Sequence, residues 1–224
     1  DDSESLNLTK DIESTKKYFS SHSEIETGCS IIDGHICYNN EPIIALEDIK
    51  IKGRHNYENA MAAILAVKEF GVDNHVIADV LKIFGGVEHR MEFVKSINHI
   101  DFYNDSKSTN ITSTQIALAS FDRPTVLLMG GLDRGHSFDE LTDYLKNVKL
   151  IVAFGETKAR INDFASEHGI PCQTFSALSE ATKAAYRFSS PGYVILLSPA
   201  CASWDQYDNF ETRGNMFKKY VGEL

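Results

Sequence analysis

The sequence has no excess of basic residues, no long apolar run and no paired-cysteine motif. Its 22 lysines and arginines are outnumbered by 32 aspartates and glutamates, which gives a net charge of −10 and a pI near 5.2. This balance leaves no broad cationic face, and so argues against a nucleic-acid or membrane-surface partner. No stretch approaches the roughly 20 apolar residues that a membrane-spanning helix requires. Any phosphate site must therefore be local and built from a few cationic side chains.

The 4 cysteines show neither CxxC nor metal-like spacing, and no signal peptide precedes them. We therefore expect reduced thiols in a cytoplasmic protein. His89 has no second ligand in sequence range, so we expect no metal site within this chain. The chain opens on Asp1 rather than methionine, which predicts that it is a piece of a longer protein.

Two nucleotide-binding motifs are also missing. No P-loop of the form GxxxxGK[ST] occurs, and Gly130-Gly-Leu-Asp-Arg-Gly135 is not the GxGxxG of dinucleotide-binding proteins. A dehydrogenase is therefore the less favoured interpretation of a glycine-rich strand end.

What is present is a strand–helix alternation beyond Asn110. Continuous apolar strands separated by amphipathic helices predict a parallel sheet covered on both faces, with right-handed crossovers. The class is therefore α/β, and residues 94–224 should form a small Rossmann-like domain. The expected strands are 125–129, 150–154, 172–175 and 193–197. One helix is expected to begin at residue 137, and three more are expected at 157–168, 178–188 and 209–221.

The first part of the chain has a different pattern. Two short apolar runs, 29–32 and 35–38, are joined by Asp33-Gly34, a strong hairpin signal. Two helices follow, and Gly85-Gly86 ends the second. We place a domain junction and a hinge near residue 93, so that the domains are 1–93 and 94–224.

The polar stretch Asn104-Asp-Ser-Lys-Ser-Thr-Asn110 lies between a predicted strand, 97–103, and a predicted helix that Thr109 or Asn110 caps. Open α/β sheets bind ligands at such strand ends. Lys107 supplies an amine for phosphate, and Asp105 a carboxylate for ribose, base or metal. The alternative is an ordinary polar loop with a surface Lys107–Asp105 pair.

Two further places hold candidate ligand contacts. Arg90 lies on a loop and can offer a bidentate fork to phosphate, or pair with Glu88 or Glu92 on the surface. Asn56 can cap the helix that follows Gly53, and Asn59 is close enough to reach the same helix end. The alternative for these amides is one cap and one surface side chain.

These motifs resemble the Mur ligases of peptidoglycan synthesis. The resemblance rests on Asn104–Asn110, on Gly85-Gly-Val-Glu-His-Arg90 and on the tail Leu197-Ser-Pro-Ala-Cys-Ala-Ser-Trp-Asp-Gln-Tyr-Asp-Asn-Phe-Glu-Thr-Arg-Gly214. The tail narrows the resemblance to the members that add D-glutamate to UDP-N-acetylmuramoyl-L-alanine, using ATP and an acyl phosphate. It implies that residues 1–93 end a central ATP-binding domain and that 94–224 bind the acceptor amino acid.

The resemblance also implies residue roles. Lys107 is expected at the transferred phosphate. Arg134 stands where the family commonly has lysine, so the charge is kept and a fork is gained. Trp204 and Tyr207 are expected to be packing residues. The implied nucleotide contacts are Asn56, Asn59, Arg90 and Asp105, and the implied D-glutamate contacts are Thr109, Arg134, Ser203 and Phe210.

Parts of the family pattern have no match here, namely the P-loop, the magnesium-binding acid, the carbamylated lysine and the UDP-binding domain. We therefore expect the Mg²⁺ ligands to lie mainly upstream of Asp1 and this fragment to be inactive on its own. We also expect the protein to be a monomer. Two other interpretations stay open. One is another amide ligase, such as the diaminopimelate- or lysine-adding enzyme or folylpolyglutamate synthase, although a DNPR-like triplet is missing. The other is a non-catalytic Rossmann-like module that binds a nucleotide or amino acid.

Overall fold

A computed structural model describes residues 3–224 and divides the chain into two compact units, one ending at Gly85 and one spanning Gly86–Leu224. Each unit has its own hydrophobic core. The junction therefore lies ahead of the expected residue 93. The reason is local pairing: strand β5 (Glu92–Ile97) is antiparallel to β6 (Ile100–Asn104), so position 93 falls inside the sheet of the second unit.

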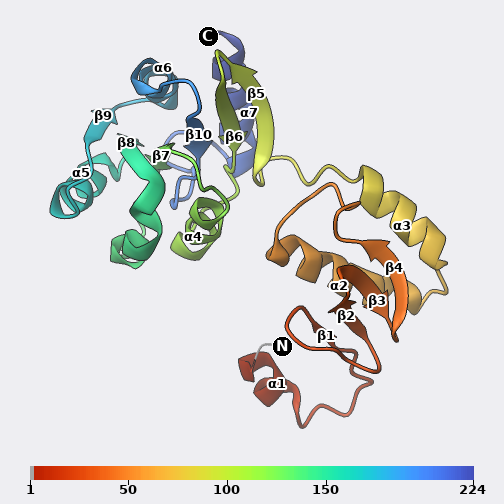
Figure 1. The fold of residues 1–224 in the computed structure, drawn as a ribbon. Helices are drawn as coiled ribbons and strands as arrows, with labels where there is room; N and C mark the ends of the chain where they lie inside the picture. The colour runs from red at the N-terminus through yellow and green to blue at the C-terminus, as the bar shows by residue number, and fades with distance from the viewer. Residues whose placement is uncertain (1–2) are drawn as a thin grey trace. The chain divides into compact units, whose positions relative to one another are not determined.

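The first unit is a four-stranded sheet with two packed helices, α2 and α3 (Figure 1). The predicted hairpin between β2 and β3 is confirmed, and its Asp33-Gly34 turn has the positive φ angles, 46° and 73°, of such tight turns. The elements are α1 (Ser3–Thr9), β1 (Phe19–Ser20), β2 (Cys29–Ile32), β3 (His35–Tyr38), β4 (Glu41–Ala45), α2 (Arg54–Lys68) and α3 (Asn74–Ile83).

The second unit contains a six-stranded sheet in the order β5-β6-β10-β7-β8-β9 (Figure 1). All neighbours are parallel except β5 and β6, which confirms the predicted mostly parallel α/β domain. Its remaining elements are α4 (Ile111–Ala119), β7 (Thr125–Gly130), the 3₁₀ helix η1 (Asp139–Asn147), β8 (Val148–Phe154), α5 (Lys158–Glu167), β9 (Cys172–Phe175), α6 (Leu178–Phe188), β10 (Val194–Leu197) and α7 (Phe210–Gly222).

The helices of the second unit cover both faces of this sheet. Side chains of α4, η1 and α5 pack into one core cluster, and those of α6 and α7 pack into another on the opposite face. Every residue of β7 and β10 is buried, as expected for central strands enclosed on two sides. The sheet is thus a rigid platform whose strand ends position the loops.

One predicted strand is wrong. The segment 97–103 is not a single strand, because Asn98 and His99 form a turn with φ angles of 51° and 62° that separates β5 from β6. Asparagine tolerates this left-handed conformation better than most residues. The chain reaches Asn104 by way of a hairpin, and β6 alone leads into the polar stretch.

Within residues 3–224, every helix is too short or too polar to cross a bilayer. The 4 cysteines are free thiols, and Cys29, Cys37 and Cys201 are buried. Burial raises the pKa of the Cys201 thiol to about 11, so this thiol is protonated at neutral pH and is a poor nucleophile.

Candidate functional site

Three loops leave neighbouring strands at the carboxyl edge of the second sheet. β10 lies between β6 and β7, with Leu197 opposite Asn104 on one side and Leu128 on the other. The chain order reverses at β10, and such a switch point is where open α/β sheets form ligand sites. The loops are the β6–α4 loop (105–110), the β7–η1 loop (131–138) and the β10–α7 loop (198–209).

A fully buried arginine joins two of these loops. Arg213 of α7 is 0% exposed, and its Nε donates to Ser106 Oγ at 3.0 Å. Its Nη2 donates to the Ser106 carbonyl at 2.8 Å and its Nη1 to the Cys201 carbonyl at 3.0 Å. Burial lowers the pKa of Arg213 to about 10, which still leaves it charged at neutral pH. Arg213 therefore places a buried positive charge against the β6–α4 and β10–α7 loops. Within residues 3–224, no carboxylate is hydrogen-bonded to this guanidinium.

The third loop approaches the same place through glycine. A Cβ added to Gly131, whose φ is 145°, would lie 2.2 Å from the Ala202 carbonyl oxygen and 3.2 Å from Nη1 of Arg213. The N–H of Leu132 donates to that carbonyl at 2.9 Å. Only glycine permits this close backbone approach, so the β7–η1 loop is held against the β10–α7 loop.

Asp105, the first residue of the β6–α4 loop, is buried, with 3% of its surface exposed. Its Oδ2 accepts hydrogen bonds from Ser198 Oγ at 2.8 Å and from Ser108 Oγ, and its Oδ1 accepts from the Met91 N–H at 3.2 Å. Burial raises the pKa of Asp105 to about 6, although those bonds and the charge of Arg90 oppose the shift. The surface pair between Lys107 and Asp105, which was the alternative interpretation of this stretch, is absent among residues 3–224, because the carboxylate accepts hydrogen bonds from other protein donors.

Asp105→Asn is expected to change how stability depends on pH. The folded pKa near 6 exceeds the ordinary 3.8, so the wild-type protein loses stability as pH rises from about 4 to about 6. Because one pKa unit is worth about 1.4 kcal/mol, the variant should gain about 3 kcal/mol relative to the wild-type protein across that window. Urea unfolding at several pH values measures this difference.

Asp101→Asn is the matched control. A hydrogen bond from Arg123 lowers the pKa of Asp101, so that carboxylate stabilises the fold above its ordinary pKa and loses the effect as pH falls. The stability difference between Asp101→Asn and the wild-type protein should therefore change with pH in the opposite direction to that of Asp105→Asn. A stability difference for Asp105→Asn that stays constant from pH 4 to 7 would contradict the burial argument.

Arg90 is held between two residues in an unusual backbone conformation. His89 and Met91 have φ angles of 65° and 47°, a conformation that non-glycine residues adopt only when their surroundings impose it. The His89 ring packs so closely on α7 that a Cβ added to Gly214 would lie 2.3 Å from its Nδ1. Asn104 contacts the same nitrogen at 3.0 Å.

The alternative for Arg90, a surface ion pair with Glu88 or Glu92, is not formed within residues 3–224. Glu92 and Glu88 both pair with Lys218, Glu92 at 3.0 Å and Glu88 at 3.7 Å. Arg90 is exposed and makes no ion pair in that range. Its guanidinium is therefore available to an anion.

Lys107 is exposed on the β6–α4 loop, with its Nζ 4.1 Å from the centroid of the Phe210 ring. Its backbone N–H donates to the His89 carbonyl at 3.0 Å. Phe210 begins α7, and its carbonyl accepts a bond from Ser106 Oγ at 2.8 Å. A cation over an aromatic face keeps its other side open to solvent.

The other predicted residues of this unit lie on the same loops. Asn110 caps α4, its side chain accepting a hydrogen bond from the Ser113 N–H at 2.9 Å, as predicted. Thr109 precedes this cap and is half-buried. Ser203, on the β10–α7 loop, is buried, and its carbonyl accepts from the N–H of Tyr207 at 2.8 Å.

Arg134 extends from the β7–η1 loop and lies over an aromatic ring. Its guanidinium carbon is 4.8 Å from the centroid of the Trp204 ring. The prediction that Trp204 is a packing residue is wrong: its side chain is 62% exposed, and its ring faces the Arg134 guanidinium instead of belonging to a core cluster. Tyr207 does pack, against the core cluster beneath α6 and α7.

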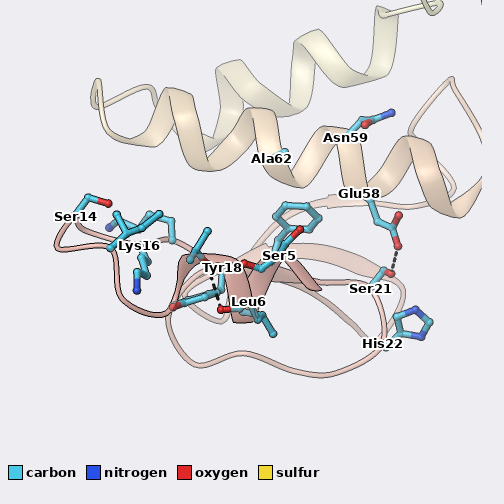
Figure 2. A pocket seen from close by; sticks show the side chains of 14 residues that line it. Ser5, Leu6, Ser14, Lys16, Tyr18, Ser21, His22, Glu58, Asn59 and Ala62 are labelled. Carbon is cyan, nitrogen blue, oxygen red and sulfur yellow. Dashed lines mark hydrogen bonds between the residues drawn. The ribbon is translucent and has the colours of Figure 1, made fainter. Parts of the chain in front are cut away.

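The candidate residues of the first unit lie at the start of α2. Asn56 is not the helix cap: Gly53, with φ 103°, holds that position, and the Asn56 amide donates to the Lys52 carbonyl at 2.8 Å. Asn59 is exposed and lines a hollow of 680 Å³. Figure 2 shows Glu58 bonded to Ser21 across this hollow, whereas the Asn59 amide points away from α1. The two amides therefore do not converge on one helix end.

The family model for the Mur ligase glutamate ligase domain matches residues 89–201, half of the chain. The chain belongs to the Mur ligase family. The matched segment starts at His89 and includes the β6–α4 and β7–η1 loops, so it contains most of the edge described above.

Two curated relatives of this Mur ligase chain are named UDP-N-acetylmuramoylalanine--D-glutamate ligase. The one from Bacillus thuringiensis (strain Al Hakam) is 46% identical over 225 residues, covering 100% of this chain and 50% of that protein. The one from Listeria monocytogenes serotype 4b is 47% identical over 224 residues, covering 100% and 49%. The chain thus spans about half the length of the curated relatives it matches.

A solved structure supports the fold. MurF from Acinetobacter baumannii superimposes with a TM-score of 0.67 at 20% identity, covering 92% of this chain and 47% of that one. At this identity the likeness concerns architecture alone.

Sequence reasoning missed three residues of this Mur ligase site. The tail motif includes Arg213 and Gly214 but assigns neither a role, and the sequence predicts only packing for Trp204. Arginine is rarely fully buried. The four-residue spacing of Arg213, Phe217 and Val221 nevertheless places Arg213 on the buried face of α7 and could have indicated its position. For Trp204 the usable signal was the cluster of small residues before it, which is typical of an irregular loop rather than a packed element.

Proposed function

We propose that this chain is part of an ATP-dependent ligase that joins D-glutamate to UDP-N-acetylmuramoyl-L-alanine in cytoplasmic peptidoglycan precursor synthesis. The observation behind the proposal is the identity of 46–47%, over the full chain, to two relatives named for that reaction. The edge of the second sheet supports it, because exposed cations lie there on adjacent loops. An anionic nucleotide and a dicarboxylic amino acid are the ligands that such an edge favours.

The chemistry requires charge neutralisation more than covalent participation by the protein. A carboxylate is a poor electrophile, so ATP converts it to an acyl phosphate; the amine of D-glutamate then attacks the acyl carbon and phosphate leaves. Phosphoryl transfer depends on positioned positive charge. Lys107 is our candidate for contact with the phosphoryl group, and the buried charge of Arg213 lies behind the same loop.

The acceptor amino acid is assigned to the β7–η1 and β10–α7 loops. Arg134 supplies a guanidinium that makes no ion pair within residues 3–224, and it is our candidate for a D-glutamate carboxylate. Thr109 and Ser203 lie on the adjoining loops, and Phe210 begins α7; all three are proposed to complete the pocket.

Nucleotide contacts are proposed in each unit separately. In the second unit Arg90 is exposed and unpaired within residues 3–224, which suits a phosphate contact. The nucleotide contact predicted for Asp105 stays a prediction. Asp105 also accepts a hydrogen bond from the Met91 N–H, which holds the backbone beside Arg90. In the first unit, Asn59 is a better candidate for an adenine contact than Asn56, whose amide is already bonded to Lys52.

Magnesium is implied by the family, but the residues present do not fit a magnesium site. Residues 3–224 contain no group of three His, Cys, Asp or Glu side chains that could hold a metal ion. Both oxygens of Asp105 already accept hydrogen bonds from the protein. The roles proposed for the residues of this chain do not depend on a magnesium ion bound by them.

The reaction can be tested with the full-length protein. We expect phosphate release from ATP that requires both UDP-N-acetylmuramoyl-L-alanine and D-glutamate. Release that requires diaminopimelate or lysine, or a folate with L-glutamate, would assign the chain to another amide ligase. Ligand binding without any phosphate release would favour a non-catalytic module.

Arg134→Ala in the full-length enzyme is expected to raise the KM for D-glutamate by about ten- to a hundredfold. The reason is the loss of one charge-assisted pair worth about 1.5–3 kcal/mol. Steady-state kinetics with each substrate varied in turn measures the effect. Equal increases in the KM for ATP and for D-glutamate would remove Arg134 from the acceptor pocket.

A further inference from the structure

Trp204 is the only tryptophan of the chain, and it is exposed beside a residue proposed to bind substrate. Its ring lies against the guanidinium of Arg134, with 4.8 Å between the guanidinium carbon and the ring centroid. We infer that Trp204 is a positioning residue that holds the plane of the Arg134 guanidinium and so directs its fork at the side-chain carboxylate of the acceptor. This inference rests on the proposed function.

The first support is the geometry of the guanidinium. Stacking uses its flat face, whereas all of its N–H groups lie in the plane and point outward. An arginine held by an aromatic ring therefore keeps its donors available for a bidentate carboxylate. Arg134 forms no ion pair within residues 3–224, so its donors are not occupied by a protein carboxylate.

The second support is that both backbones are anchored while both side chains stay exposed. Beside Arg134, Asp133 pairs with Arg160 of α5 and accepts from the Gly135 N–H at 2.8 Å. Arg160 also donates to the His136 carbonyl at 2.8 Å. The backbone of the β7–η1 loop is thus held on each side of Arg134. What these contacts leave undetermined is the direction of the Arg134 side chain.

The β10–α7 loop is anchored in a similar way around Trp204. Asp205 accepts a hydrogen bond from the Glu156 N–H at 3.1 Å, and the Ser203 carbonyl accepts from the Gln206 N–H at 3.1 Å. A rigid backbone presents the indole as a fixed surface. Lysine, which has no plane to orient, would gain less from such a surface than arginine.

The test compares Trp204→Leu and Trp204→Phe in the full-length ligase. An exposed cation–π contact is worth a modest amount, so Trp204→Leu should raise the KM for D-glutamate about two- to fivefold. The kcat and the KM for ATP should not change, and Trp204→Phe should recover most of the loss. The preference for D-glutamate over D-glutamine should fall by a similar factor, because only the former has the second carboxylate.

A double-mutant cycle separates positioning from indirect damage. In an Arg134→Lys background, Trp204→Leu should have almost no further effect on the KM for D-glutamate, because the planar group is gone. Phe188→Leu, at an aromatic side chain that is also exposed, is the control for removing surface area and should leave all constants unchanged. Melting temperatures of all variants should match that of the wild-type enzyme.

The possible failures are distinct. If the wild-type enzyme releases no phosphate with D-glutamate, the proposed function fails. If the wild-type enzyme is active but Trp204→Leu leaves the KM for D-glutamate unchanged, the positioning inference is overturned. An equal effect of Trp204→Leu in the Arg134→Lys background would overturn it as well.

Discussion

Replacing Lys107 with alanine in the full-length ligase is expected to lower kcat by about two to three orders of magnitude. The estimate follows the loss of one preorganised donor to an oxygen on which charge develops. Because that charge grows on the way to the transition state, the effect should fall on kcat rather than on ground-state binding. The KM for D-glutamate should change little. Steady-state phosphate release measures both constants.

The alternative is that Lys107 is only a surface side chain. Its contact with the Phe210 ring would then be worth about 0.5–1 kcal/mol of stability, with no effect on turnover. Lys107→Arg should restore only part of the activity, since a planar fork does not replace a compact ammonium. Lys219→Ala, at an exposed lysine of α7, serves as the control. Near-normal kcat in the Lys107→Ala variant, with a loss of stability no larger than about 0.5–1 kcal/mol, would leave the surface interpretation standing.

The second large effect is expected at Arg213. Arg213→Met keeps an extended side chain but removes the bonds to the Ser106 and Cys201 carbonyls, which are buried. Each of the two buried acceptors left without a donor costs about 1–3 kcal/mol, so the second unit should lose about 2–6 kcal/mol of its free energy of unfolding. Activity should fall as well, because the two loops that flank the site are no longer tied together. Urea unfolding and kinetics on the same preparation test both statements.

Arg187→Met is the control for this variant, because Arg187 is an exposed arginine of α6 and its loss should change stability by less than about 0.5 kcal/mol. Arg213→Lys keeps the charge but cannot reach both loops with one ammonium, so it should retain part of the stability and less of the activity. A methionine variant as stable as the wild-type protein would show that the buried guanidinium costs as much in desolvation as its hydrogen bonds return.

Much of the second unit could be predicted because its strands and helices follow clear patterns. β9 and α6 have the expected bounds, and the parallel order follows from apolar strands alternating with helices. The 3₁₀ form of η1 could not be predicted, because an amphipathic pattern does not distinguish it from an α-helix. The Asn98-His99 turn was missed because the apolar residues on each side of it continue one strand-like pattern.

The sequence could predict where the candidate residues Lys107 and Arg134 lie, but not which partners the buried side chains contact. The positions of Lys107 and Arg134 follow from strand ends, since strand ends can be located from apolar runs. The use of Asp105 as an internal acceptor depends on Ser198, which is distant in sequence and adjacent only through the pairing of β6 with β10. Long-range pairing of this kind leaves no trace in local spacing.

The place of β10 in the sheet has a consequence for how the chain is made. β6 and β7 are synthesised early, yet neither pairs with the other: both pair with residues 194–197. Until those residues leave the ribosome, two strand edges of the nascent second unit remain open, and open edges are sites of association between chains. The sheet therefore closes after translation of β10 rather than strand by strand. Dependence on a chaperone should accordingly be greatest for chains stalled between residues 130 and 194.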